Sequence, residues 1–151
     1  MDAEALRAAG WQQIGMDGFS GLAGPFWMIE ENGRRRLGVQ IEARHCNNHI
    51  GTIHGGMVMT FADMALGIGV SDALDGNRNC STISLNTQFL NPVYPGEFLY
   101  CYPEVTRTSK SVIFVRGLLE TKDRVVASVE GIWKVIDQSR IKPINVTGAD
   151  S

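Results

Sequence analysis

The chain has 151 residues, of which 44% are hydrophobic, and a formal net charge of −2 at pH 7. This length allows one substantial core but is too short for two independent domains. The small charge, without an extended basic block, predicts no nucleic-acid partner and no attraction to an anionic membrane surface.

Three features predict where the protein works. The N-terminus is acidic and lacks the basic start and apolar run of a secretory signal. The longest apolar stretch, residues 57–70, is shorter than the roughly 20 residues of a membrane span and contains Asp63. The three cysteines form no CxxC pair and are odd in number, which is typical of reduced thiols. We therefore expect a cytoplasmic protein that does not enter a membrane.

The first part of the chain predicts a short helix and a strand hairpin. Residues 3–9 favour a helix, and the glycine-rich residues 17–25 favour an irregular loop. A strand near residues 26–30 is followed by Asn32-Gly33, a dipeptide typical of tight hairpin turns. Residues 37–43 alternate apolar and polar side chains, which indicates a strand with one buried face.

The middle of the chain predicts one long helix and the strand after it. Residues 55–71 carry apolar side chains on almost every side, and a helix that is apolar all round is a buried one. Residues 81–90 alternate again, with Ile83 and Leu85 on one face and Thr82 on the opposite, polar face.

Three more strands complete the predicted sheet, over residues 97–106, 111–121 and 124–136. Their close spacing favours an antiparallel meander. Pro103 has no backbone N–H to donate, so its strand should form an edge or a bulge there.

These elements predict an α+β domain in which an antiparallel sheet wraps around a long central helix. We assign residues 1–25 to an N-terminal helix and loop, residues 26–137 to the main domain and residues 138–151 to a polar tail. Wrapping leaves one flank of the apolar helix uncovered, and a second copy of the chain would cover it, so we expect a homodimer.

The three histidines of the chain, His45, His49 and His54, fall within ten residues and raise the question of a metal site. Their spacing would suit three ligands only on one continuous helix, yet Asn47-Asn48 and Gly51 favour a loop. Because no known zinc spacing is matched, we expect no metal, with His45 and His49 as surface or loop histidines.

Gly55 and Gly56 stand where this loop meets the helix. Backbone amides at a helix N-terminus, without side-chain shielding, attract a developing oxyanion. The alternative is that the glycines allow close packing of the helix start.

Asp63 is the one acid in this apolar helical run. Burying an unpaired carboxylate costs several kcal/mol, so Asp63 needs a reason to be there. Poor solvation makes a carboxylate a better base, which suits activation of a water or direct attack on an acyl carbon. The alternative is a hydrogen-bond anchor for a neighbouring loop.

Gly55 and Asp63 are eight positions apart, or about 12 Å along one helix. One chain cannot easily bring both to one carbonyl group. Two antiparallel copies of the helix would place Gly55 of one chain beside Asp63 of the other.

This segment resembles the signature of the hotdog-fold thioesterases of the phenylacetate-pathway type, through the spacing Asn48-x-x-Gly51-x-x-His54-Gly55-Gly56-x6-Asp63. The likeness extends over most of the chain, from about residue 26 to residue 136. It implies a homodimer, often paired into a tetramer, that hydrolyses acyl-CoA at the subunit interface. It implies no metal or redox cofactor.

The resemblance also implies a role for each residue of the segment. Gly55 would donate its amide to the thioester carbonyl, and Gly56 would contact the substrate beside it. Asn48 would orient the substrate and the bound water, and the partner subunit's Asp63 would activate that water. His54 would support the carbonyl or the leaving sulfur.

The family tends to place a hydroxyl residue after the helix, where it holds the nucleophilic water. Thr82 is our candidate, with Ser81 or Ser84 as the offset alternatives and an exposed strand threonine as the other reading. Lys110 and Ser111 are candidates for the CoA phosphates.

Two other functions are compatible with this fold. A hydratase or dehydratase would use His54 and Asp63 as an acid/base pair, although the histidine motif that we associate with dehydratases is absent from the sequence. A non-catalytic acyl-CoA binder would not need Asp63. Aromatic acyl groups, such as phenylacetyl or hydroxybenzoyl, and medium-chain acyl groups both suit the apolar residues available.

Overall fold

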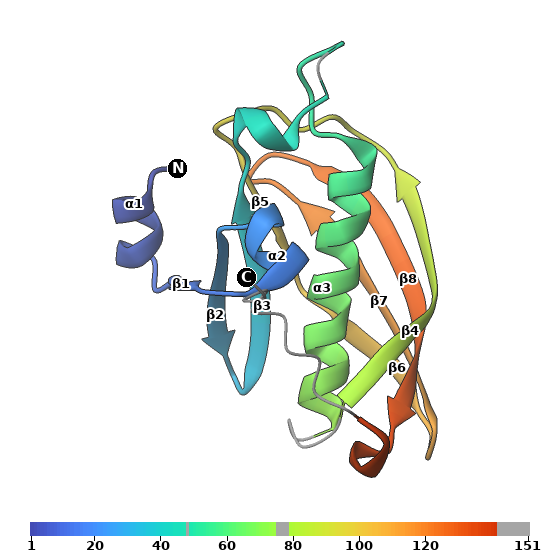
Figure 1. The fold of residues 1–151 in the computed structure, drawn as a ribbon. Helices are drawn as coiled ribbons and strands as arrows, with labels where there is room; N and C mark the ends of the chain where they lie inside the picture. Colours follow the sequence, from blue (N-terminus) through green and yellow to red (C-terminus); the bar gives the residue numbers. More distant parts are fainter. Residues whose placement is uncertain (48, 75–78, 142–151) are drawn as a thin grey trace, which may run out of the picture.

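The computed structural model describes residues 1–47, 49–74 and 79–141. An antiparallel sheet of eight strands curves around one long helix, α3 (Gly55–Ala73), as Figure 1 shows. The predicted α+β arrangement, with a sheet wrapped around a central helix as in a hotdog fold, is confirmed. Within the described ranges no helix is both long and apolar enough to cross a membrane.

The strands follow the order β1-β2-β3-β5-β7-β8-β4, and β6 pairs with β7. Strand β4 lies at one end of this order and pairs with β8. The strands are β1 (Gln12–Ile14), β2 (Phe26–Glu31), β3 (Arg34–Gln40), β4 (Asn79–Phe89), β5 (Phe98–Cys101), β6 (Glu104–Thr108), β7 (Val112–Glu120) and β8 (Val125–Ile136). The shorter helices are α1 (Ala3–Ala8), α2 (Gly18–Ala23), η1 (Ala43–His45) and η2 (Gln138–Arg140).

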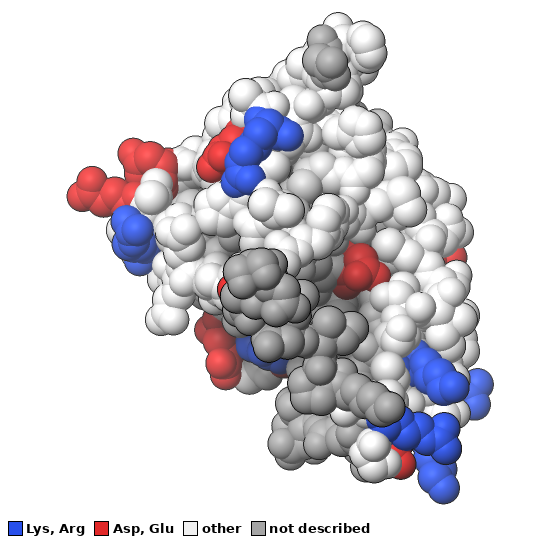
Figure 2. Space-filling view, viewed as in Figure 1, with Lys and Arg blue, Asp and Glu red and all other residues white. Residues whose placement is uncertain are grey.

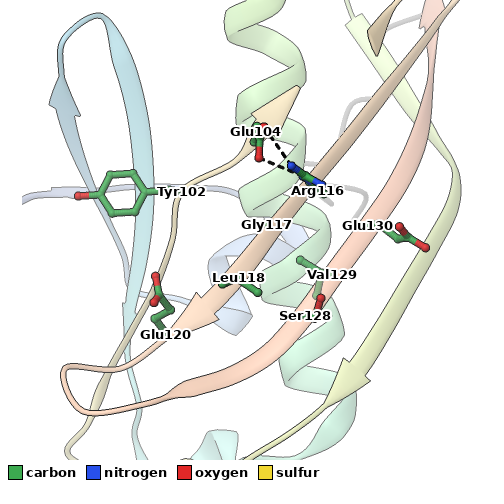
Figure 3. Close-up of a pocket in the computed structure, with 9 residues that line it drawn as sticks. All are labelled: Tyr102, Glu104, Arg116, Gly117, Leu118, Glu120, Ser128, Val129 and Glu130. Carbon is green, nitrogen blue, oxygen red and sulfur yellow. Dashed lines mark hydrogen bonds and ion pairs between the residues drawn. The ribbon is translucent and has the colours of Figure 1, made fainter. Parts of the chain in front are cut away.

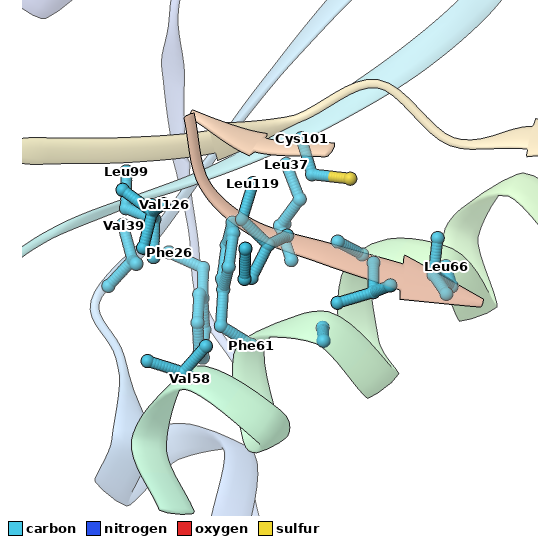
Figure 4. Close-up of a cluster of buried hydrophobic side chains, with 14 of the residues drawn as sticks. Phe26, Leu37, Val39, Val58, Phe61, Leu66, Leu99, Cys101, Leu119 and Val126 are labelled. Carbon is cyan, nitrogen blue, oxygen red and sulfur yellow. The ribbon is translucent and has the colours of Figure 1, made fainter. Parts of the chain in front are cut away.

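The core lies between α3 and the concave face of the sheet (Figure 4). Val58, Phe61 and Leu66 come from one side of α3, and the Phe61 ring stacks 6.4 Å from the ring of Phe26 in β2. The other side of α3 is only partly covered: Met59 is 40% exposed and Met64 is half-buried. One flank of this apolar helix is therefore open in a single chain, as the sequence predicts.

The predicted hairpin turn joins β2 to β3. Asn32 and Gly33 both have positive φ angles, 53° and 73°. These are the residue types that tolerate the left-handed region in a two-residue turn. The turn fixes the β2–β3 register, in which Leu37 lies opposite Met28.

The predicted strand over residues 97–106 is two strands, β5 and β6, with Pro103 between them. Both pair with β7, so the break at Pro103 is confirmed. Helix α3 passes close to this break, because a Cβ atom added at Gly69 would lie 2.5 Å from the Cβ atom of Pro103.

The expectation of an irregular loop over residues 17–25 is wrong. Residues Gly18–Ala23 form the helix α2, and the preceding residues Gln12–Ile14 form the strand β1, which the sequence does not signal. The side chain of the N-cap residue of α2, Asp17, makes no capping hydrogen bond. Contacts from distant residues hold the helix instead: Arg44 Nη1 donates to the carbonyl oxygen of Leu22 at 2.6 Å.

The N-terminal segment contributes to both faces of the sheet. Leu6 of α1 and Trp11 form a small core with Trp27 and Phe98. Trp27 is next to Phe26 in its strand, and Phe26 faces α3. Because neighbouring strand residues point to opposite faces, this small core lies on the convex face. Helix α2, in contrast, buries Ala23 in the main core beside α3 (Figure 1).

Candidate active site

Asp63 and Thr82 lie in contact between α3 and β4. The Thr82 hydroxyl donates a hydrogen bond to Asp63 Oδ1 at 2.6 Å. Asp63 is half-buried in the single chain, so its carboxylate has both a polar partner and access to a ligand. A carboxylate held by one neutral donor keeps its second oxygen available to accept a proton.

A β-bulge turns Thr82 toward Asp63, which corrects the predicted face of this residue. The register between β4 and β8 shifts between Thr82 and Ser84, so Ile83 has no partner on β8. Thr82 lies opposite Trp133, which is buried in the core. Leu85 also packs against that core, so Thr82 and Leu85 share the concave face instead of opposite faces.

The alternatives to Thr82 lie differently. Ser84 lines a groove on the convex face together with Asn86. Ser81 is next to the cavity at Asp63, but among the described residues the hydrogen bond to Asp63 comes from Thr82. Thr82 is therefore the hydroxyl residue that the structure brings to the acid.

Asp63 and Thr82 open into a cavity of about 490 Å³ between α2, α3 and the sheet. Apolar side chains line part of it, including Met64, Ile68 and Trp133. Other lining residues are polar, including Ser20, Ser71 and Ser81, so this open hollow offers both apolar and hydrogen-bonding contacts to a small molecule.

A larger hollow of about 520 Å³ lies on the convex face (Figure 3). It holds the acids Glu120 and Glu130 and an ion pair in which Arg116 Nε lies 3.0 Å from Glu104 Oε2. Its excess of acids repels an anionic ligand, and none of the predicted site residues that the structure describes lines it. We therefore place the candidate active site at Asp63.

The two glycines at the start of α3 have different surroundings. His54 is the N-cap, and its Nδ1 accepts a hydrogen bond from the Gly56 amide at 2.8 Å. A Cβ atom at position 56 would lie 2.9 Å from that nitrogen, so close packing explains Gly56. A Cβ atom at Gly55 would meet only ordinary contact with Phe89, at 3.6 Å. Packing against the described residues therefore does not explain Gly55.

The Gly55 amide is the first of the helix and has no acceptor among the described residues. A free amide there carries the positive end of the helix dipole. His54 is exposed, and an imidazole that accepts at Nδ1 carries its proton on Nε2, where it can still donate to a ligand. Substrate contact by Gly56 stays a prediction.

The other histidines of this segment have different surroundings. His49 is exposed, and its backbone amide donates to Asn47 Oδ1. The predicted catalytic residue Asn48 lies outside the described residues. Within the described part of the chain, no three His, Cys, Asp or Glu side chains form a group that would hold a metal ion.

His45 is buried, which the sequence does not predict. Its Nδ1 accepts from the Glu42 amide at 3.0 Å, and its Nε2 lies 3.2 Å from the carbonyl oxygen of Gly24. Burial, followed by the charge of Arg44, lowers the pKa of His45 below its ordinary value. A neutral His45 therefore links η1 to the end of α2.

This link predicts a loss of stability in mild acid. The unfolded chain binds a proton at His45 near about pH 6.5, whereas the folded protein binds it only at lower pH. The free energy of unfolding should therefore fall as the pH drops below about 6.5, because the unfolded state then binds more protons. In His45→Gln, the free energy of unfolding, measured with denaturant between about pH 7.5 and about pH 5, should depend less on pH than in the wild type. Equal pH dependence in the two proteins would contradict this role.

Lys110 and Ser111 lie in the exposed turn between β6 and β7 and do not line the cavity at Asp63. Lys134 is near them, because it pairs with Val112 in the β7–β8 ladder. One chain thus brings Asp63 and Thr82 together but leaves the Gly55 amide about two helical turns from them.

Comparisons with known proteins place these features in a family. Residues 50–128 match the sequence model of the thioesterase superfamily. The chain is 29% identical over 113 residues to "Putative esterase PA0474" of Pseudomonas aeruginosa, which covers 74% of this chain and 84% of that protein.

Two solved structures share the fold. The phenylacetic acid degradation protein PaaI of Thermus thermophilus, in a mutant form, superimposes with a TM-score of 0.69. It is 19% identical, and the match covers 80% of this chain and all of that one. The protein BH2602 of Bacillus halodurans, solved with CoA, has a TM-score of 0.65 and is 27% identical. That match covers 72% of this chain and 71% of the other.

Proposed function

Because this chain belongs to the thioesterase superfamily and is a thioester hydrolase, we propose that it hydrolyses acyl-CoA thioesters to free acid and CoA. Asp63 activates the attacking water in this proposal. The observation that carries it is the 2.6 Å hydrogen bond from Thr82 to Asp63 at the edge of a cavity that is partly lined by apolar side chains.

The reaction uses the groups of this site in order. A water beside Asp63 and Thr82 gives a proton to Asp63 as its oxygen attacks the thioester carbon. The Thr82 hydroxyl donates to Asp63 Oδ1, so its own oxygen remains free to accept a hydrogen bond from that water. The carbonyl oxygen becomes negative and is stabilised by the Gly55 amide. When the intermediate collapses, the carbon–sulfur bond breaks, and the CoA sulfur takes up the proton from Asp63.

The complete site in this proposal lies between two chains. Gly55 and Asp63 are about 12 Å apart along one helix, too far to act on one carbonyl. The partner subunit's Asp63 would meet the Gly55 amide if two α3 helices lie antiparallel across a twofold axis.

The surface around α3 supports this dimer. Met59 is 40% exposed on α3 and Ile83 is 57% exposed on β4, at the edge of the sheet. In Figure 2 the visible surface over the upper part of α3 and β4 is almost free of charged side chains, with an acidic patch below it. A surface with few charges and exposed apolar side chains, beside a strand edge that no other described strand pairs with, favours association with a second copy. A tetramer and a cytoplasmic location remain predictions.

CoA is the proposed carrier of the acyl group. The likeness to BH2602, solved with CoA, supports it. Lys110 and Ser111 remain the predicted phosphate contacts, and Lys134 adds a third polar side chain nearby. Asn48 keeps its predicted role in orienting the substrate and the water. The proposed chemistry needs water, one base and one amide, and so calls for no metal or redox cofactor.

Hydration or dehydration is less well supported. It would require His54 and Asp63 to act as a pair on one substrate. His54 Nδ1 instead accepts a hydrogen bond from the Gly56 amide at the start of α3, so that nitrogen is not free to act as a base. Hydrolysis needs a base only at Asp63.

The test is release of CoA thiol from phenylacetyl-, hydroxybenzoyl- and straight-chain acyl-CoAs. We expect release from at least one class, which also identifies the acyl group. Thr82→Val keeps the side-chain shape but removes the hydrogen bond to Asp63, so kcat should fall about 10- to 100-fold. Thr82→Ser should restore most of it. No thiol release from any substrate by the wild-type protein would refute the proposed function.

A further inference from the structure

The cavity at Asp63 has a wall that comes from the N-terminal segment. Met16 and Ser20 line it, and Ser20 belongs to α2. The family match begins only at residue 50. This wall therefore lies outside the part of the chain that carries the shared sequence pattern.

The cavity follows α3 away from the reacting groups. Asp63 and Ser71 both line it, and eight helical residues span about 12 Å. Met64 and Ile68 face it between them. Arg35 lines it as well, and its Nε is already held by Asp72 Oδ1 at 2.6 Å. An acyl chain whose carbonyl lies at Asp63 has this open passage, partly lined by apolar side chains, for its tail.

Helix α2 is fixed in place, so its side chains form a firm wall. Ala23 is buried in the main core. His45 and Arg44 bind the carbonyl groups at the C-terminal end of α2, as described above. A Cβ atom at Gly21 would lie only 2.3 Å from the carbonyl oxygen of Met16, so these two residues are packed closely.

We propose that Met16 and Ser20 determine which acyl groups the enzyme accepts, by setting the width of the passage beyond Asp63. This inference rests on the proposed function. A small side chain at position 20 leaves room for the acyl tail, whereas Met16 occupies space beside it. The N-terminal segment thus adapts a shared catalytic arrangement to a particular substrate size.

Two substitutions should change the acyl preference in opposite directions. Ser20→Leu adds bulk to the passage, so the ratio of kcat/KM for long to short straight-chain acyl-CoAs should fall at least about tenfold. Met16→Ala removes bulk, so the same ratio should rise. Hydrolysis of short acyl-CoAs shows that each variant is folded, because a short acyl group occupies little of the passage.

A matched control separates size from other effects. Leu22→Ala shortens a side chain on α2 that is 74% exposed and does not line the cavity, so this variant should keep the wild-type ratio. If Ser20→Leu and Met16→Ala also keep the wild-type ratio, or lower kcat/KM equally for all substrates, the inference is wrong while the proposed function stands. A wild-type protein that hydrolyses no acyl-CoA would overturn both.

Discussion

Replacing Asp63 with asparagine is expected to lower kcat for thioester hydrolysis by about 10²- to 10⁴-fold while leaving the fold intact. Asparagine has the shape of aspartate but does not take a proton from water. Its carbonyl oxygen can still accept the hydrogen bond that Thr82 now donates to Asp63 Oδ1. The change therefore removes the base and retains its neighbours. Hydrolysis rates and thermal unfolding of the two proteins measure this directly.

Substrate binding provides the control for this prediction. Asp63→Asn should bind a non-hydrolysable acyl-CoA analogue about as well as the wild type, because the cavity keeps its shape. A kcat within tenfold of the wild type would show that Asp63 is not the base. A single turnover in heavy-oxygen water distinguishes the two ways in which a carboxylate can act. Label that enters Asp63 shows direct attack through a mixed anhydride that water opens at the Asp63 carboxyl carbon, whereas water activation places all of the label in the released acid.

The sequence predicts the elements that depend on local pattern. Residues 55–71 are apolar on nearly every side, and they form α3 with only small differences at its ends. Asn32-Gly33 predicts the tight turn, because each of these residues tolerates a positive φ angle. Asp63 stands out because an acid in an apolar helix needs a polar partner.

Features that depend on distant contacts could not be predicted in this way. The Thr82 side chain faces Asp63 because of a β-bulge at Ile83, and this bulge exists only because β4 pairs with β8. Simple alternation assigns Thr82 to the opposite face. Helix α2 has glycines within it, its N-cap residue Asp17 makes no capping hydrogen bond, and it is held by Arg44 and His45 from another part of the chain.

The two glycines at the start of α3 show a further limit of prediction from the sequence. In the sequence, Gly55 and Gly56 look alike, and either could supply an amide or allow close packing. Only the position of the His54 ring shows that Gly56 is needed for the cap, while Gly55 keeps a free amide among the described residues.

That difference makes Gly55→Pro a selective test of the oxyanion contact. Proline is favoured at the first position of a helix, and the preceding His54 already has the extended backbone that proline requires, with φ −68° and ψ 135°. The substitution thus deletes one N–H and keeps the helix. We expect kcat to fall about 10²- to 10³-fold. Gly55→Ala retains the N–H and meets only ordinary contact with Phe89, so it should remain active. Equal activity of the proline and alanine variants would show that the Gly55 amide does not stabilise the oxyanion.

Mixing the two inactive chains tests whether the site is shared. In a dimer of one Asp63→Asn chain and one Gly55→Pro chain, a shared arrangement joins the intact Gly55 of the first to the intact Asp63 of the second. One site of the two is then complete, and activity should rise to about half of the wild type, far above either parent. If each chain used its own Gly55 and Asp63, both sites of the mixed dimer would be damaged. Its activity would then be no greater than that of the parents, which places the two residues in one chain and refutes the dimeric site.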